Sequence, residues 1–172
     1  MRIVNGESLV SYLRERMPHC ERLLVCGVGN DLRGDDGIGL YVADRISVNG
    51  LPEKVKVLKC GEMPENYIFE IREWCPSHIL MVDAADLGKD PGTAVMVESN
   101  ELYTKSISTH RLPLSLFSKI VAAELGGKLN VLMIGIQVGS CDFGAEVSAP
   151  VREAGDWVAG SILELISCLE QE

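Results

Sequence analysis

Residues 22–46, RLLVCGVGNDLRGDDGIGLYVADRI, decide the fold of this chain, because they join a buried strand to a helix through a glycine-rich loop. Arg22–Gly27 is a short apolar run that ends in glycine, which is typical of a strand covered on both faces. From Asp36 to Ile46 the apolar side chains recur every four residues and therefore share one helical face. The stretch predicts a strand followed directly by a helix, as in α/β proteins.

The chain on either side of this stretch continues to alternate between the two patterns. Helices are predicted over Leu9–Met17 with Ser8 as N-cap, over Pro64–Trp74, over Leu114–Leu125 and over Val151–Leu169. Strands are predicted over Val55–Cys60, Ile79–Asp83, Thr93–Val97 and Val131–Val138. The last of these strands is the longest apolar run and is expected at the centre of the sheet, whereas the first alternates lysine with valine, as an edge strand does. The alternation predicts an α/β/α sandwich with a mostly parallel sheet.

One connection is too short for a parallel crossover. Only Leu87–Gly92 separates the strand that ends at Asp83 from the strand that begins at Thr93. A parallel connection needs a dozen residues or more, because the chain must return to the same end of the sheet. We therefore expect the strand over Thr93–Val97 to run antiparallel to its neighbours.

The composition limits the classes of protein to which the chain can belong. Its 172 residues suit a single domain over 1–172, and 47% of them are hydrophobic. A formal net charge of −9 argues against a nucleic-acid partner, because such binding needs a basic surface. No apolar stretch approaches the roughly 20 residues that span a bilayer, and the N-terminus lacks a signal-peptide pattern. The sequence predicts a cytoplasmic protein that does not bind membranes.

The glycines and cysteines do not form a recognisable cofactor or metal motif. Gly27 and Gly29 resemble the start of a dinucleotide-binding fingerprint, but Leu32 occupies the position of its third glycine. The six cysteines include no C-x-x-C pair, so neither a zinc ribbon nor a thioredoxin motif is indicated. We expect ordinary reduced thiols.

Two loops that follow strands carry acids. Asp35 and Asp36 stand where the first loop meets its helix, and Asp83 follows the apolar run that begins at Ile79. Sites in open α/β sheets form beyond the carboxyl ends of the strands, where these acids lie. A structural role is the alternative: helix capping for one acid of the first pair, and an Asx-turn into Gly88 for the neighbouring Asp86.

Histidine provides the third candidate. The chain has three histidines, and His110 stands in a loop directly before a predicted helix. His19 and His78 lie in contexts typical of surface or capping residues, and a single histidine more often has a structural role. Together, Asp36, Asp83 and His110 provide two carboxylates and one imidazole. Such a set suits nickel, zinc, manganese or iron, and three protein ligands leave positions open for water or substrate.

The sequence resembles the hydrogenase maturation endopeptidases, which process the large subunits of [NiFe]-hydrogenases. The likeness extends over nearly the whole chain and is carried by motifs in a specific order. These are Gly27–Asn30, Asp35–Gly39, Gly61–Asn66, Met81–Asp86, Thr109–Leu114 and Gly135–Gln137. The sequence departs from many relatives at Glu62, where they have glycine, serine or threonine, and in about twenty additional residues before the first expected strand.

The resemblance implies a fold, a site and a reaction. The fold is a twisted five-stranded sheet between helices, with one antiparallel strand. The family's two acids and histidine fall on Asp36, Asp83 and His110, as metal-binding and catalytic residues. The implied activity is a nickel-dependent endopeptidase of aspartic type that removes the C-terminal extension of a [NiFe]-hydrogenase large-subunit precursor after nickel insertion. Nickel would arrive with the substrate or bind weakly, and no organic cofactor is implied.

Two other functions remain open from the sequence alone. The chain would act as a nickel-dependent maturation chaperone if it bound the precursor without cleaving it. It would act as a generic zinc metallopeptidase if it held its own zinc ion and cleaved unrelated peptides. Whether nickel activates water or only allows the substrate to bind is also open.

Overall fold

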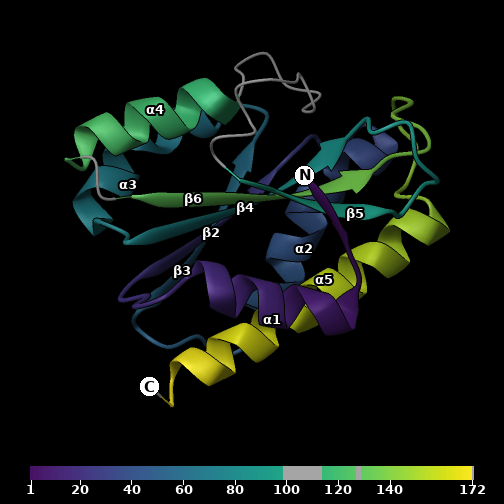
Figure 1. The fold of residues 1–172 in the computed structure, drawn as a ribbon. Helices are drawn as coiled ribbons and strands as arrows, with labels where there is room; N and C mark the ends of the chain where they lie inside the picture. Colours follow the sequence, from purple (N-terminus) through teal and green to yellow (C-terminus); the bar gives the residue numbers. More distant parts are fainter. Residues whose placement is uncertain (99–113, 127–128, 172) are drawn as a thin grey trace.

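The computed structural model describes residues 1–98, 114–126 and 129–171. A single twisted sheet lies between two layers of helices, as Figure 1 shows, with α3 and α4 on one face and α1, α2 and α5 on the other. The class predicted from the sequence, a three-layer α/β/α sandwich, is confirmed.

Strands and helices alternate along most of the chain. The strands are β1 (Arg2–Val4), β2 (Leu23–Val28), β3 (Val55–Gly61), β4 (His78–Ala85), β5 (Ala94–Glu98) and β6 (Asn130–Gln137). The helices are α1 (Gly6–Arg16), α2 (Ile38–Ser47), α3 (Ile68–Trp74), α4 (Leu114–Glu124) and α5 (Ala149–Leu169), with short 3-10 turns η1 (Gly34–Gly37) before α2 and η2 (Pro64–Tyr67) before α3. None of the helices in the described part of the chain is long and apolar enough to cross a membrane.

The sheet has the strand order β1-β5-β6-β4-β2-β3. Strands β2, β3, β4 and β6 pair in parallel, whereas β5 pairs antiparallel with both β6 and β1. The predicted antiparallel strand is thus confirmed, as are the central place of β6 and the edge position of β3. The sheet has six strands rather than the expected five, because the short β1 pairs with the outer edge of β5.

The N-terminal extension forms β1 and α1. Helix α1 begins earlier than the sequence predicted, because Asn5 rather than Ser8 is its N-cap. The Ser8 amide donates to Asn5 Oδ1 and the Asn5 amide donates to Ser8 Oγ, each at 3.0 Å, so the two residues form a reciprocal capping box. Helix α1 packs on α5, where Ser161 Oγ donates to the Gly6 carbonyl at 3.3 Å.

Two apolar cores fill the spaces between the sheet and the helices. The larger core contains Leu13 of α1, Ile38 of α2 and Ile162 of α5, together with Val82 of β4. The smaller core, under α3 and α4, contains Phe117 and the alternate β4 residue Met81. Because successive strand residues face opposite sides, this alternation also assigns Asp83 to the side of α3 and α4.

Helix α2 lies unusually close to the sheet at its first turn. A Cβ placed on Gly39 would stand 2.2 Å from the Val28 carbonyl oxygen and 2.3 Å from that of Val82. Gly29 has φ at +144°, and a Cβ placed on it would stand 2.0 Å from the Asp36 carbonyl oxygen. The glycines of this loop therefore allow backbone to approach backbone, which brings Asp36 to the ends of β2 and β4.

Candidate active site

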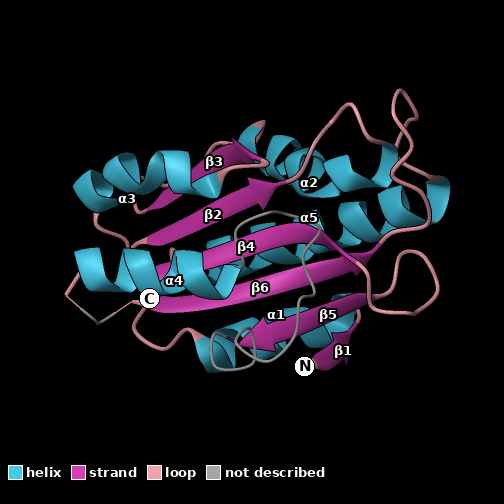
Figure 2. Ribbon diagram, turned by 90° about the horizontal axis from the view of Figure 1, so that it is seen from above, coloured by secondary structure: helices cyan, strands magenta, loops and turns pink. Residues whose placement is uncertain are grey.

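The loops that carry the predicted acids meet at one edge of the sheet. In Figure 2 the arrowheads of β2, β3, β4 and β6 point to the same side, and the long connections lie there. These connections follow Val28, Gly61, Ala85 and Gln137. We call this side the carboxyl edge, which is where α/β sheets place their sites.

Asp36 lies within η1 and is 4% exposed. Its carbonyl accepts a hydrogen bond from the Asn30 amide at 3.2 Å, which closes the loop on itself. Neither Asp35 nor Asp36 is an N-cap, because the N-caps of η1 and α2 are Arg33 and Gly37, and neither cap has a side-chain hydrogen bond. Both acids do lie in the first turn of η1, where acidic side chains are favoured. Burial of an ionised carboxylate has a cost in desolvation.

Asp35 has a structural role of a different kind. Its carboxylate accepts four hydrogen bonds from the loop between β6 and α5, donated by the amides of Gly139, Ser140 and Ser148 and by the Ser148 hydroxyl, at 2.6–3.1 Å. Burial raises the pKa of the Asp35 carboxyl, but these hydrogen bonds outweigh burial and lower the pKa below its ordinary value. Asp35 thus fixes one loop to the other directly beside Asp36.

Asp83 lies inside β4 rather than after it, because the strand continues to Ala85. The residue is fully buried and pairs in register with Gly135 of β6. Its neighbour Val82 is the residue whose carbonyl lies against Gly39 at the start of α2. The structure therefore brings Asp36 and Asp83 to the same edge, where η1 contacts β4.

His110 lies outside the described residues, and its position in the predicted site stays a prediction. Within residues 1–98, 114–126 and 129–171, no group of three His, Cys, Asp or Glu side chains is arranged to hold a metal ion. The assignment of Asp36 and Asp83 as metal ligands likewise stays a prediction.

The remaining acids and histidines follow a mixed pattern. Asp86 is exposed, and its side chain accepts a hydrogen bond from the Gly88 amide at 3.4 Å, which is the Asx-turn predicted as its structural role.

His19 is exposed, as expected. His78 is buried in β4, contrary to the surface position expected, and its Nδ1 lies 2.9 Å from Ser77 Oγ. Burial lowers the pKa of His78, so its imidazole is neutral at physiological pH.

Two further residues near this edge were not among the predicted site residues. Burial raises the pKa of the Cys141 thiol, and the charges of Asp36 and Asp35 raise it further, which places this thiol beside both acids. Glu65, in η2, has a buried Oε2 atom without a hydrogen-bond partner, the only such side-chain atom in the described part of the chain. Only the position of Cys141 in a loop after a central strand indicated its proximity, and no sequence signal identified Glu65.

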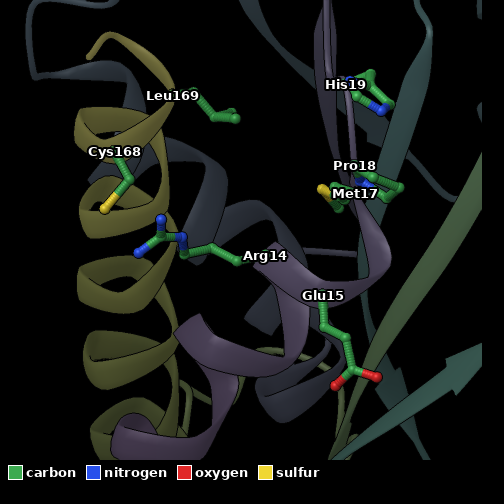
Figure 3. Close-up of a pocket in the computed structure, with 7 residues that line it drawn as sticks. All are labelled: Arg14, Glu15, Met17, Pro18, His19, Cys168 and Leu169. Carbon is green, nitrogen blue, oxygen red and sulfur yellow. The ribbon is translucent and has the colours of Figure 1, made fainter. Parts of the chain in front are cut away.

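Three hollows in the described part of the surface lie at the edge opposite the carboxyl edge. Figure 3 shows one of about 430 Å³ between the ends of α1 and α5, where Arg14 extends toward α5 near Cys168 and Glu15 points away. Two others also include His19. None of these three hollows is lined by Asp36, Asp83 or Glu65.

The fold and the carboxyl edge define an α/β/α protein with two buried acids at this edge, Asp36 in η1 and Asp83 near the end of β4. Residues 40–165 match the sequence model of the HycI hydrogenase maturation protease family. The chain is 30% identical over 165 residues to a putative hydrogenase maturation protease of Methanocaldococcus jannaschii, covering 92% of this chain and 96% of the relative. It is 31% identical over 137 residues to the hydrogenase 3 maturation protease of Escherichia coli K12, covering 79% and 85%.

A solved structure agrees with these relatives. The crystal structure of the [NiFe] hydrogenase maturation protease HycI from Thermococcus kodakarensis KOD1 superposes with a TM-score of 0.83 at 31% identity, covering 91% of this chain and 99% of that one. The chain belongs to the hydrogenase maturation protease family. It is therefore a peptidase, and the family acts in the maturation of hydrogenases.

Proposed function

We propose that this peptidase removes the C-terminal extension of a [NiFe]-hydrogenase large-subunit precursor after nickel has been inserted. The observation that carries the proposal is the pair of buried carboxylates, Asp36 and Asp83, brought to one edge by the contact of η1 with β4. Two carboxylates held in a water-poor setting favour a divalent cation, and their oxygen atoms suit nickel.

The nickel ion belongs to the substrate in this proposal. Asp36, Asp83 and His110 would bind the ion that the precursor already holds, so an empty precursor would lack the group that these residues recognise. The donor set fits, because two oxygens and one imidazole are borderline ligands that leave positions open. Bound in this way, the ion would polarise the scissile carbonyl or lower the pKa of a water molecule. Asp36 or Asp83 would then accept the proton of the attacking water.

The test compares the wild-type chain with three substitutions on nickel-loaded and nickel-free precursor. Wild-type chain is expected to shorten only the loaded precursor, as read by intact mass spectrometry. Asp36→Asn and Asp83→Asn keep the size of each side chain but remove its charge, so we expect the cleavage rate to fall by about a hundredfold or more. Asp86→Asn is the matched control, because Asp86 forms only an exposed Asx-turn, and it should cleave like wild type.

His110→Ala belongs to the same experiment and should lose cleavage as the two acid variants do. Binding of the loaded precursor without any mass change would instead show a chaperone. Cleavage of unrelated peptides, with a metal that survives dialysis against chelator, would show a zinc peptidase. Normal processing by both Asp36→Asn and His110→Ala would contradict the site assignment.

A further inference from the structure

Three large apolar side chains are exposed to solvent at the carboxyl edge, and two of them, Leu32 and Phe143, lie on loops that are hydrogen-bonded to each other; the third, Met63, follows β3. Leu32, in the loop after β2, is 57% exposed, and Phe143, in the loop after β6, is 81% exposed. We call this pair the apolar rim. Single exposed apolar residues are common, but here two occur on neighbouring loops beside the buried acids.

The rim is held in place by hydrogen bonds between its two loops. The Gly144 amide donates to the Leu32 carbonyl at 2.8 Å. Because Gly144 directly follows Phe143, this bond holds the backbones of the two rim residues together. The Gly34 amide donates to the Ala145 carbonyl at 3.1 Å, and the Asp35 amide donates to the Ser140 carbonyl at 3.0 Å. The four bonds to the Asp35 carboxylate complete the connection. Because the loops are fixed, the rim would lose little conformational entropy on binding a partner.

The charges around the rim point to a basic partner. The loops 29–33, 62–63 and 140–146 carry exposed acidic side chains and one exposed basic side chain, Arg33. The acids are Asp31, Glu62, Asp142 and Glu146. Loops 29–33 and 62–63 are adjacent, because the Gly29 amide donates to the Gly61 carbonyl at 3.0 Å. An apolar contact surrounded by acids favours a segment with an apolar side chain among basic residues.

We propose that the apolar rim is the docking surface for the stretch of precursor polypeptide beside the cleavage point, and that this stretch carries an apolar side chain flanked by basic residues. This inference rests on the proposed function, since Asp35 joins the rim to the loop that holds Asp36. The rim contributes affinity and orientation, whereas the acids contribute the chemistry. Substitution of the rim should therefore raise KM and leave kcat nearly unchanged.

The experiment measures cleavage of nickel-loaded precursor by the Leu32→Ser/Phe143→Ser double variant. We expect KM to rise about ten- to a hundredfold with kcat within about twofold of wild type, because two exposed anchors are lost. Val48→Ser is the matched control: Val48 is 82% exposed at the C-cap of α2, away from the carboxyl edge, and its KM should not change. Thermal unfolding should be the same for all three chains, because no buried contact is removed.

A charge variant tests the second half of the inference. Glu146→Lys replaces an exposed acid in the loop after β6, so we expect KM to rise severalfold at low salt and to depend less on salt than in wild type. A wild-type chain that fails to cleave loaded precursor would remove the proposed function itself. A double variant that matches Val48→Ser would overturn the docking surface alone. So would wild-type self-association that the double variant abolishes, since the rim would then bind a second copy.

Discussion

At the scale of single residues, the adjacent acids Asp35 and Asp36 have different surroundings. Both are buried, yet the carboxylate of Asp35 is occupied by four donors from the loop after β6. Asp36 neither caps η1 nor caps α2. A sequence shows two identical side chains in this pair, and only the four donors show that Asp35 is the acid that joins the two loops.

Asp35→Asn should reduce the free energy of unfolding by about 2–3 kcal/mol at pH 7, because the asparagine amide would present donors to donors in a buried site. The measurement is urea denaturation, with Asp31→Asn in the exposed part of the same loop as the control. Equal stability of Asp35→Asn and wild type would contradict the role given to the four hydrogen bonds.

The same pair of chains should differ in pH dependence. The pKa of Asp35 is lower in the folded chain than in the unfolded chain. Its contribution to stability is therefore complete above the unfolded pKa of about 3.9 and is lost as pH falls through the folded value. The stability difference between wild type and Asp35→Asn should be constant from pH 7 to about pH 5 and should shrink below about pH 4. A difference that is unchanged at pH 3 would contradict this assignment.

At the scale of elements, the position of α2 and α5 depends on how close the backbones can come. Gly155 of α5 faces α2, where an added Cβ would stand 2.7 Å from Ile38 Cδ1 and 3.1 Å from Tyr41 Cδ1. Gly160, one and a half turns later, has nothing within 4 Å. The two glycines therefore lie on the same helix, but Gly155 is packed against α2 and Gly160 is not.

Alanine at these two positions should have opposite effects. Gly160→Ala should stabilise the chain by about 0.5–1 kcal/mol, because alanine favours the helix and meets no neighbour. Gly155→Ala gains the same propensity but forces apart α2 and α5, and we expect a net loss of up to about 2 kcal/mol. Denaturation midpoints measure both. A Gly155→Ala chain that is as stable as Gly160→Ala would show that the helices separate without cost.

At the scale of the whole molecule, the N-terminal extension completes both the sheet and the larger core. Strand β1 covers the edge of β5, and α1 buries Leu9 and Leu13 fully against the core that contains α5. The predicted site lies at the carboxyl edge of the central strands, so we expect changes in the extension to affect stability more than the reaction.

Two changes to the extension test this division. Leu13→Ala should cost about 2–5 kcal/mol of unfolding free energy, whereas Ser11→Ala on the exposed side of α1 should change it by less than about 0.5 kcal/mol. Removal of residues 1–20 should lower stability further and promote association through the uncovered β5 edge, measured by light scattering. A truncated chain with the wild-type denaturation midpoint would contradict the structural role of the extension.

The local patterns of the sequence determined the class of fold and the edge at which the acids meet. Apolar runs of strand length, helical spacing in α2 and a connection too short for a crossover were sufficient, because burial on both faces and chain reach are local constraints. They placed Asp36 and Asp83 at the carboxyl edge, although Asp83 lies within β4 rather than beyond it. The sixth strand was not predicted, because three residues at an edge carry too little pattern to identify a strand.

Only the tertiary structure showed that Asp35, rather than Asp36, joins the loop after β2 to the loop after β6. The four donors to Asp35 come from residues more than a hundred positions away, and no local pattern specifies such partners. The same holds for Cys141 beside the acids and for Leu32 joined to Gly144. Hydrophobic periodicity indicates which side of a segment faces the core. Which loops contact each other depends instead on how the folded strands and helices pack together. The apolar rim and the different surroundings of the two acids arise from that packing.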